Sequence, residues 1–320
     1  MVLAVPGEEG TKMAILIQTS NNPVSPAAAQ RLAVTRAGQL SAFVTRERRG
    51  ADQRCPWELV SLTGHSDAER AAMAWIVAEA VMRQRCGPSP TAFPAWERAT
   101  LAGRKLQGVE REVVLSFAEP VFKPQEKATA EEHHGVPGYV GEWLWYLLAL
   151  EQPDLPDRVR EYLAEPSLTV TDSGGDGLVI HRVGGAVASA LMFRLWEMKK
   201  YTGGRDQISG TIKGAWDQLA SSGTRYLAAQ MGWAYKHVAG DVGAFVSMLP
   251  DLWANGDSRG GAGVSVATNS SATPQRRAFS RSHERIPRLK HAGQLQGLII
   301  AVDDFAGFAA QVQETVWTAL

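Results

Sequence analysis

The segment Leu191–Tyr201, LMFRLWEMKKY, constrains the fold most, because an apolar strand pattern ends there in charged residues. Side chains alternate between the two faces of an extended strand, so Leu195, Glu197 and Lys199 share one face. Burying a carboxylate and an ammonium beside an apolar run is costly unless the charges pair with each other or hold a metal. The pattern therefore predicts a core strand with a functional end.

Asp176 is the second acid of interest. It lies in the sequence GGDG, between the apolar segments Leu168–Val170 and Leu178–Ile180. A hairpin at this point could bring its carboxylate next to Glu197. An Asp followed by Glu-x-Lys is the set of residues used in metal-dependent phosphodiester cleavage, in which a cation neutralises the developing charge and an ammonium stabilises the transition state.

Glu142 is a candidate third acid. We expect it in the first turn of a helix over Tyr139–Glu151, directly after Gly141 and among apolar neighbours. Taken singly, each of these residues has a plainer explanation: a carboxylate at a helix N-terminus, an ordinary glycine turn, or an exposed ion pair at a strand end. Their order, a helix Glu, a turn Asp and a strand Glu-x-Lys followed by a helix, favours the functional interpretation.

The overall charge limits how this chain can contact nucleic acid. The chain has 320 residues, of which 45% are hydrophobic, and its formal net charge is zero. It is therefore long enough for a substantial core, but any phosphate contact must come from a local patch. The best candidate patch is a basic run, for which a solvated loop is the alternative: Arg276, Arg277, Arg281, Arg285, Arg288 and Lys290.

Other candidates are weaker. His133 and His134 could hold a metal, but adjacent histidines in a polar linker are more often solvated. Gln207 and Gln218 could contact a substrate or could belong to a polar helix face. Cys55 and Cys86 lack metal-ligand spacing, so we expect two ordinary thiols in a reducing compartment.

Helical and strand periodicities predict an α/β or α+β layered fold, with a mixed central sheet flanked by helices. We place a linker at Glu119–Gly138, so residues 1–128 form an N-terminal accessory region and residues 129–320 the main domain. The predicted helices are Ser66–Arg85, Tyr139–Glu151, Asp157–Glu165, Asp206–Ser221, Thr224–Val238, Val242–Asn255 and Phe305–Ala319. The predicted strands are Met13–Gln18, Ser41–Thr45, Glu112–Phe117, Leu168–Thr171, Leu178–Arg182, Ala190–Lys199, Gly263–Thr268 and Leu295–Val302.

The order of these motifs resembles the PD-(D/E)XK nuclease superfamily, over roughly residues 130–300. The resemblance rests on GEWLWYLL around Glu142, GGDGLVI around Asp176 and LWEMKKY around Glu197 and Lys199. It implies a restriction-endonuclease-like fold, metal binding by Asp176, Glu197 and Glu142, and a catalytic role for Lys199. More narrowly, the segments resemble the HamA-like nuclease subunit of Hachiman-type antiphage systems, which implies a helicase partner.

We therefore expect a cytoplasmic nuclease that uses Mg²⁺ or Mn²⁺ to cleave DNA, acting as a bacterial antiphage effector with a helicase. Two alternatives stay open. One is a stand-alone restriction-type endonuclease whose residues 1–125 recognise the sequence. The other is a catalytically silent nuclease fold that binds nucleic acid. Because no run of eighteen apolar residues occurs, we expect no membrane insertion.

Overall fold

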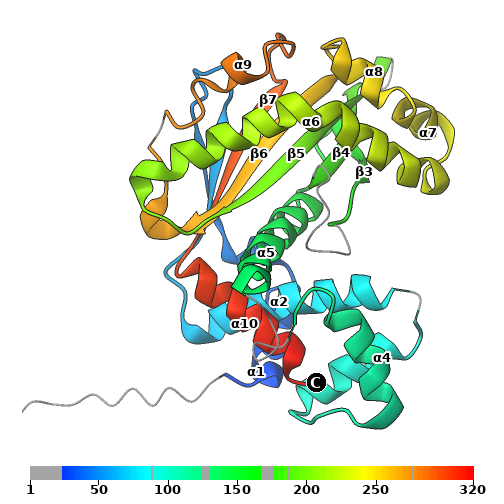
Figure 1. Cartoon of the computed structure of the whole chain (residues 1–320), viewed down its shortest axis with the longest axis vertical. Coiled ribbons are helices and arrows are strands. Elements are labelled where there is room, and N and C mark those ends of the chain that lie inside the picture. Colours follow the sequence, from blue (N-terminus) through cyan, green and yellow to red (C-terminus); the bar gives the residue numbers. More distant parts are fainter. Residues whose placement is uncertain (1–23, 88, 124–129, 167–175, 186–187, 276) are drawn as a thin grey trace, which may run out of the picture.

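The computed structural model describes residues 24–87, 89–123, 130–166, 176–185, 188–275 and 277–320. Over these residues the chain forms ten α-helices and one seven-stranded mixed sheet, which confirms the predicted α/β class (Figure 1). The strands are β1 (Thr45–Arg49), β2 (Trp57–Leu62), β3 (Arg158–Leu163), β4 (Gly177–Gly185), β5 (Ala188–Tyr201), β6 (Gly260–Asn269) and β7 (Leu295–Val302). The helices are α1 (Pro26–Thr35), α2 (Asp67–Cys86), α3 (Ala92–Leu101), α4 (Gly108–Ala118), α5 (Ala130–Leu150), α6 (Ile208–His237), α7 (Gly240–Val246), α8 (Leu249–Ala254), α9 (Ser282–Arg285) and α10 (Phe305–Trp317).

The strand order across the sheet is β1-β2-β7-β6-β5-β4-β3. Strands β2, β7, β6 and β5 run parallel to one another. β1 pairs antiparallel with β2, β4 with β5, and β3 with β4. The central strands β6 and β7 are buried along nearly their whole length, as expected for parallel strands covered on both faces. The sheet curls into a half-barrel, so its two edges approach the same side of the molecule.

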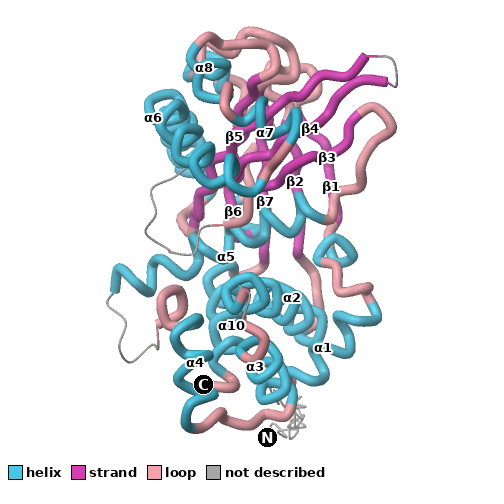
Figure 2. The backbone as a smooth tube through the Cα atoms, turned by 90° about the vertical axis from the view of Figure 1, so that its right-hand side faces the viewer, coloured by secondary structure: helices cyan, strands magenta, loops and turns pink. Residues whose placement is uncertain are grey.

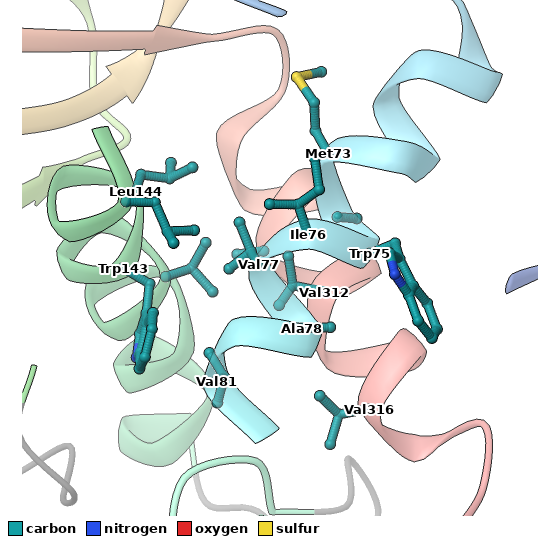
Figure 3. Packing of buried hydrophobic residues seen from close by; sticks show 14 of the residues in the cluster. Met73, Trp75, Ile76, Val77, Ala78, Val81, Trp143, Leu144, Val312 and Val316 are labelled. Carbon is teal, nitrogen blue, oxygen red and sulfur yellow. The ribbon is translucent and has the colours of Figure 1, made fainter. Parts of the chain in front are cut away.

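Helices cover both faces of the sheet. One face packs α6, α7 and α8, and α6 runs across the strands (Figure 1). The other face packs α5 with α2 and α10. Figure 3 shows Val77 and Val81 of α2 between Leu144 of α5 and Val312 of α10. Helices α1, α3 and α4 gather with α2 and α10 at one end of the molecule (Figure 2), and the short helix α9 contacts α6.

The sheet extends across the predicted boundary at residues 128 and 129. Strands β1 and β2 come from the N-terminal region, and β2 pairs with β7 near the end of the chain. Helix α2, predicted as Ser66–Arg85, is confirmed and packs against α10. Its N-terminus carries a capping box, in which Ser66 Oγ accepts from Glu69 N and the Glu69 carboxylate accepts from Ser66 N.

Three predicted elements are wrong. Glu112–Phe117 belongs to helix α4, in which Val114 and Ala118, four residues apart, form the buried face. Asp157–Glu165, predicted as a helix, contains β3, whose backbone groups pair with β4. The predicted linker Glu119–Gly138 contains the start of α5, which runs through Pro137.

The predicted C-terminal elements are largely confirmed, with changes at their boundaries. Strands β4, β5, β6 and β7 and helix α10 lie where expected, and Val242–Asn255 forms the two short helices α7 and α8. Ser41–Thr45 is mostly a 3₁₀ turn at Leu40–Phe43 that leads into β1. The predicted strands Met13–Gln18 and Leu168–Thr171 both lie outside the described residues.

The two predicted helices Asp206–Ser221 and Thr224–Val238 form one continuous helix, α6. The sequence Ser221-Ser222-Gly223 between them reads as a break, but Gly223 is buried inside the helix. A Cβ at Gly223 would lie 2.5 Å from the Trp253 ring of α8. The glycine therefore allows two helices to approach closely and does not end α6.

This packing predicts opposite effects for two Gly→Ala substitutions in α6. Gly223→Ala should lower the free energy of unfolding by about 1–3 kcal/mol, because the new methyl group overlaps the Trp253 ring. Gly214→Ala is the matched control: Gly214 is exposed, and a Cβ there meets nothing within 4 Å. The control should raise stability by up to about 1 kcal/mol. Urea unfolding of both variants tests this, and equal stabilisation by the two would contradict it.

Candidate functional site

The antiparallel pairing of β4 with β5 brings Asp176 to Glu197. Gly177 is registered with Trp196, so the preceding residue Asp176 lies across from Glu197 at the start of β4. The Asp176 Oδ2 atom accepts a hydrogen bond of 2.6 Å from the backbone N–H of Met198. The predicted proximity of Asp176 to Glu197 is thus confirmed.

Gly177, in the GGDG sequence, has a packing role as well. A Cβ on Gly177 would lie 2.4 Å from the Trp145 ring of α5. Only glycine allows this ring to cover the beginning of β4 at so short a distance. Trp145 also packs against Trp196 of β5, with ring centroids 5.6 Å apart, so α5 covers this face of the sheet next to Asp176.

Glu197 is the most deeply buried of the four predicted site residues. Its side chain is 1% exposed, and its Oε1 atom accepts from Lys199 Nζ at 2.6 Å. Its Oε2 atom is also buried but has no hydrogen-bond partner. A buried carboxylate oxygen without a partner is uncommon because its desolvation is not repaid, and a bound cation would satisfy it.

Lys199 lies on the same face of β5, as the strand alternation predicts. Burial lowers its pKa, but the charge and hydrogen bond of Glu197, with the charge of Asp176, outweigh burial, so the pKa of Lys199 is raised above its usual value. The side chain is 32% exposed. Lys199 is therefore an ammonium at neutral pH that is partly open to solvent, where it can meet an anionic group.

Glu142 reaches the site from α5, which contacts β5 and β6. Because α5 begins at Ala130, Glu142 lies more than three turns inside the helix, and its predicted place in the first turn is wrong. The pairing of a carboxylate with a helix N-terminus therefore does not explain it. Burial, together with the charge of Glu197, raises the pKa of Glu142 to about 8.

Asp176 shares this electrostatic environment. Burial raises its pKa, and the charges of Glu197 and Glu142 raise it further, whereas the hydrogen bond from Met198 and the charge of Lys199 oppose the rise. Burial likewise raises the pKa of Glu197. The structure thus brings together all four predicted residues, with three acids and one cation, and an excess of negative potential results.

Two residues of α6 complete the side of the site next to Lys199. Tyr226 is 2% exposed and lies within electrostatic range of Lys199. Its hydroxyl accepts a 2.7 Å hydrogen bond from Gln218 Nε2, so Gln218 holds Tyr226 in place. Sequence reasoning missed Tyr226, although its position seven residues after the buried Leu219 continues the apolar stripe of α6.

The basic run is only partly free to contact phosphate. Arg285 lies 3.6 Å from Asp217 of α6, and Arg288 donates to the Ala220 carbonyl of the same helix at 3.0 Å. Arg277, Arg281 and Lys290 are exposed. Arg276 and the side chains of His133 and His134 lie outside what the structure describes, and Gln207 is exposed just before α6.

No protein-family model matches the chain, and no curated protein matches it.

Among the described helices, none is long and apolar enough to cross a membrane.

The charge imbalance predicts a pH-dependent stability for the metal-free protein. The pKa of Glu142 in the folded state, about 8, lies above its ordinary value of 4.5, so protonated Glu142 favours folding. Its contribution is complete below pH 4.5 and is lost as the pH rises through about 8. Between these limits the unfolding free energy should fall by up to a few kcal/mol more in the wild type than in Glu142→Gln. Chemical denaturation across this range in EDTA tests it; parallel pH curves would contradict the burial of this carboxylate.

The Glu197–Lys199 pair gives a second prediction. Lys199→Met keeps the apolar stem but leaves Glu197 buried without its cation, so metal-free stability at neutral pH should fall by about 3 kcal/mol. Adding Glu197→Gln to this variant removes the unpaired charge and should restore most of the loss. Thermal and urea unfolding of the single and double variants check the coupling. A double variant less stable than Lys199→Met would show that the pair is not the source of the effect.

Proposed function

We propose that this protein is a metal-dependent nuclease that cleaves phosphodiester bonds of DNA. The observation that carries the proposal is the buried, unpartnered Oε2 atom of Glu197, beside Asp176 and next to the charged Lys199. A metal could bind at the free Oε2 atom of Glu197 and at Asp176, and Lys199 on the Oε1 atom could contact the phosphate of a metal-bound ester.

The donor set fits Mg²⁺ or Mn²⁺. Both are hard cations that accept carboxylate oxygens, and Mg²⁺ commonly takes one or two carboxylates and fills its other positions with water and substrate phosphate. In the described part of the chain, no three His, Cys, Asp or Glu side chains are arranged to hold a metal together. We therefore assign Asp176 and Glu197 as the ligands, and Glu142 as a residue that acts through water. When bound, the cation neutralises charge that develops on the phosphate.

The chain's own residues supply the remaining functions. Lys199, charged at neutral pH, would contact the phosphate oxygens and stabilise the added charge of the pentavalent transition state. Glu142, within electrostatic range of Glu197 and Lys199, would accept the proton of the attacking water as a general base. Tyr226 and Gln218, joined by a hydrogen bond, would bound the site on the side of α6.

A cytoplasmic role as an antiphage effector with a helicase partner is a further part of the proposal. It rests on the sequence resemblance around Glu142, Asp176 and Glu197 to HamA-like proteins. A nuclease that does not recognise a specific DNA sequence would cut the DNA of its own cell. The proposal therefore includes a partner that restrains the nuclease or delivers it to its substrate.

A plasmid assay tests the proposed activity. Purified protein should relax or linearise supercoiled DNA with Mg²⁺ or Mn²⁺ but not with EDTA. Glu197→Gln and Asp176→Asn should each lower the rate by at least about a hundredfold, because they remove anionic metal ligands while keeping side-chain size. Glu112→Gln, at an exposed position of α4, is the matched control and should keep full activity.

The outcomes separate the candidate functions. Lost cleavage in both site variants, with folded protein by circular dichroism, supports the nuclease. Wild-type protein that binds DNA but never cleaves it, with or without proteins co-purified from the native host and ATP, favours a silent binding module. Cleavage at one DNA sequence by the chain alone favours a stand-alone restriction enzyme.

A further inference from the structure

A cavity lies at the C-terminal end of α5, on the opposite face of β5 from Glu197. Its position follows from the curl of the sheet: Arg46 of edge strand β1 and Arg158 and Arg160 of edge strand β3 line the same space. Arg194 of β5 lines it too. Arg194 precedes Glu197 by three residues, so strand alternation directs the two side chains to opposite faces. The cavity is thus distinct from the candidate nuclease site.

Two of these four arginines are already compensated. Arg46 forms an ion pair with Glu58 at 3.1 Å. Arg160 donates to the carbonyls of Ala149 and Leu150 at the end of α5, where a cation is favourable, and its backbone N–H donates to Asp154. Glu58 therefore offsets the charge of Arg46, and the carbonyls at the end of α5 hold the guanidinium of Arg160.

Arg158 and Arg194 have no such compensation. The guanidinium of Arg194 donates to the Gln296 side chain and to the Gly293 carbonyl, which are neutral acceptors, and its buried Nε–H has no partner. Burial and the like charge of Arg158 lower the pKa of Arg194 to about 10. Among the described residues, Arg158 forms no ion pair with a carboxylate. Arg158 is exposed on edge strand β3 and Arg194 is half-buried, so an anion from solvent can reach two cations to which no described carboxylate is bound.

His181 lies with these two arginines. Burial and the charges of Arg158, Arg194 and Arg160 lower its pKa to about 4, against a small opposing effect of Asp154, so the ring is neutral at pH 7. A neutral ring can donate one hydrogen bond to an anion without adding another repulsive charge. Arg158, His181 and Arg194 also line an adjoining cavity that is walled by Gly260, Gly261 and Gly293.

We infer that Arg158, His181 and Arg194 form a binding site for a phosphate monoester joined to a flat, largely apolar group. Two unpaired guanidinium groups match the charge of about −2 on a phosphate monoester better than the single charge of a carboxylate, and their planar forks suit phosphate oxygens. The other wall of the cavity is apolar, formed by Trp145, Trp196, Leu148 and Leu298. A nucleoside 5′-phosphate has both halves, either as a free mononucleotide or as the 5′-phosphorylated end of a nucleic-acid strand.

Titration calorimetry in EDTA tests this inference, because it requires no cleavage and does not depend on the proposed nuclease activity. The probes are AMP, a short single-stranded DNA with a 5′-phosphate, and the same DNA with a 5′-hydroxyl. Arg158→Gln should weaken binding of the phosphorylated probe by about tenfold or more, because a charged hydrogen-bond donor is lost. Arg31→Gln, an exposed arginine of α1, is the matched control and should bind as the wild type does.

Ligand-free Arg158→Gln should melt at the same temperature as the wild type or higher, because its substitution relieves repulsion with Arg194. Binding of AMP identifies a free nucleotide as a ligand, and binding of the phosphorylated DNA alone identifies a strand end. Equal binding of DNA with a 5′-hydroxyl, unchanged binding by Arg158→Gln, or no binding of AMP and phosphorylated DNA at millimolar concentration would each overturn the assignment.

Discussion

The antiparallel pairing of β4 with β5 is the constraint on which the candidate site depends. The register that places Leu178 against Leu195 in the core also places Asp176 across from Glu197. A slip of one residue would move each buried side chain of β4 to the other face, so the apolar core of the sheet and the position of the acids are specified together. The burial of Leu178 and Leu195 therefore fixes the geometry of the charged groups.

Helix α5 connects two regions of opposite charge. Near its middle, Glu142 joins Asp176 and Glu197. Burial raises the pKa values of all three acids, and the charge of Glu197 raises those of Glu142 and Asp176 further. Beyond its C-terminus, Arg158 and Arg194 repel each other around a neutral His181. Each region carries charge that the described chain does not balance, and pKa values shifted in such a cluster are a mark of a functional site. One suits a cation and the other an anion.

Local sequence signals predicted the elements whose own periodicity was strong. The apolar spacing of α2 and of α6 indicated helices, and the charged end of β5 placed Glu197 and Lys199 on one face. The errors arose where distant contacts decided the outcome. β3 is a strand because β4 pairs with it. Gly223 lies inside a helix because its missing side chain leaves room for the Trp253 ring, and not because the chain turns there.

The amino-acid sequence by itself determined the α/β class, most helix and strand positions, and the four residues of the candidate site, because side-chain periodicity and residue chemistry are local properties. Only the tertiary structure decided that β1 and β2 join the same sheet, that Glu142 lies deep inside a helix, and that Tyr226 lies beside Lys199. It also brought Arg158 to Arg194, which are far apart in the sequence. These features depend on strand order, sheet curvature and burial, which are set by contacts between residues distant along the chain.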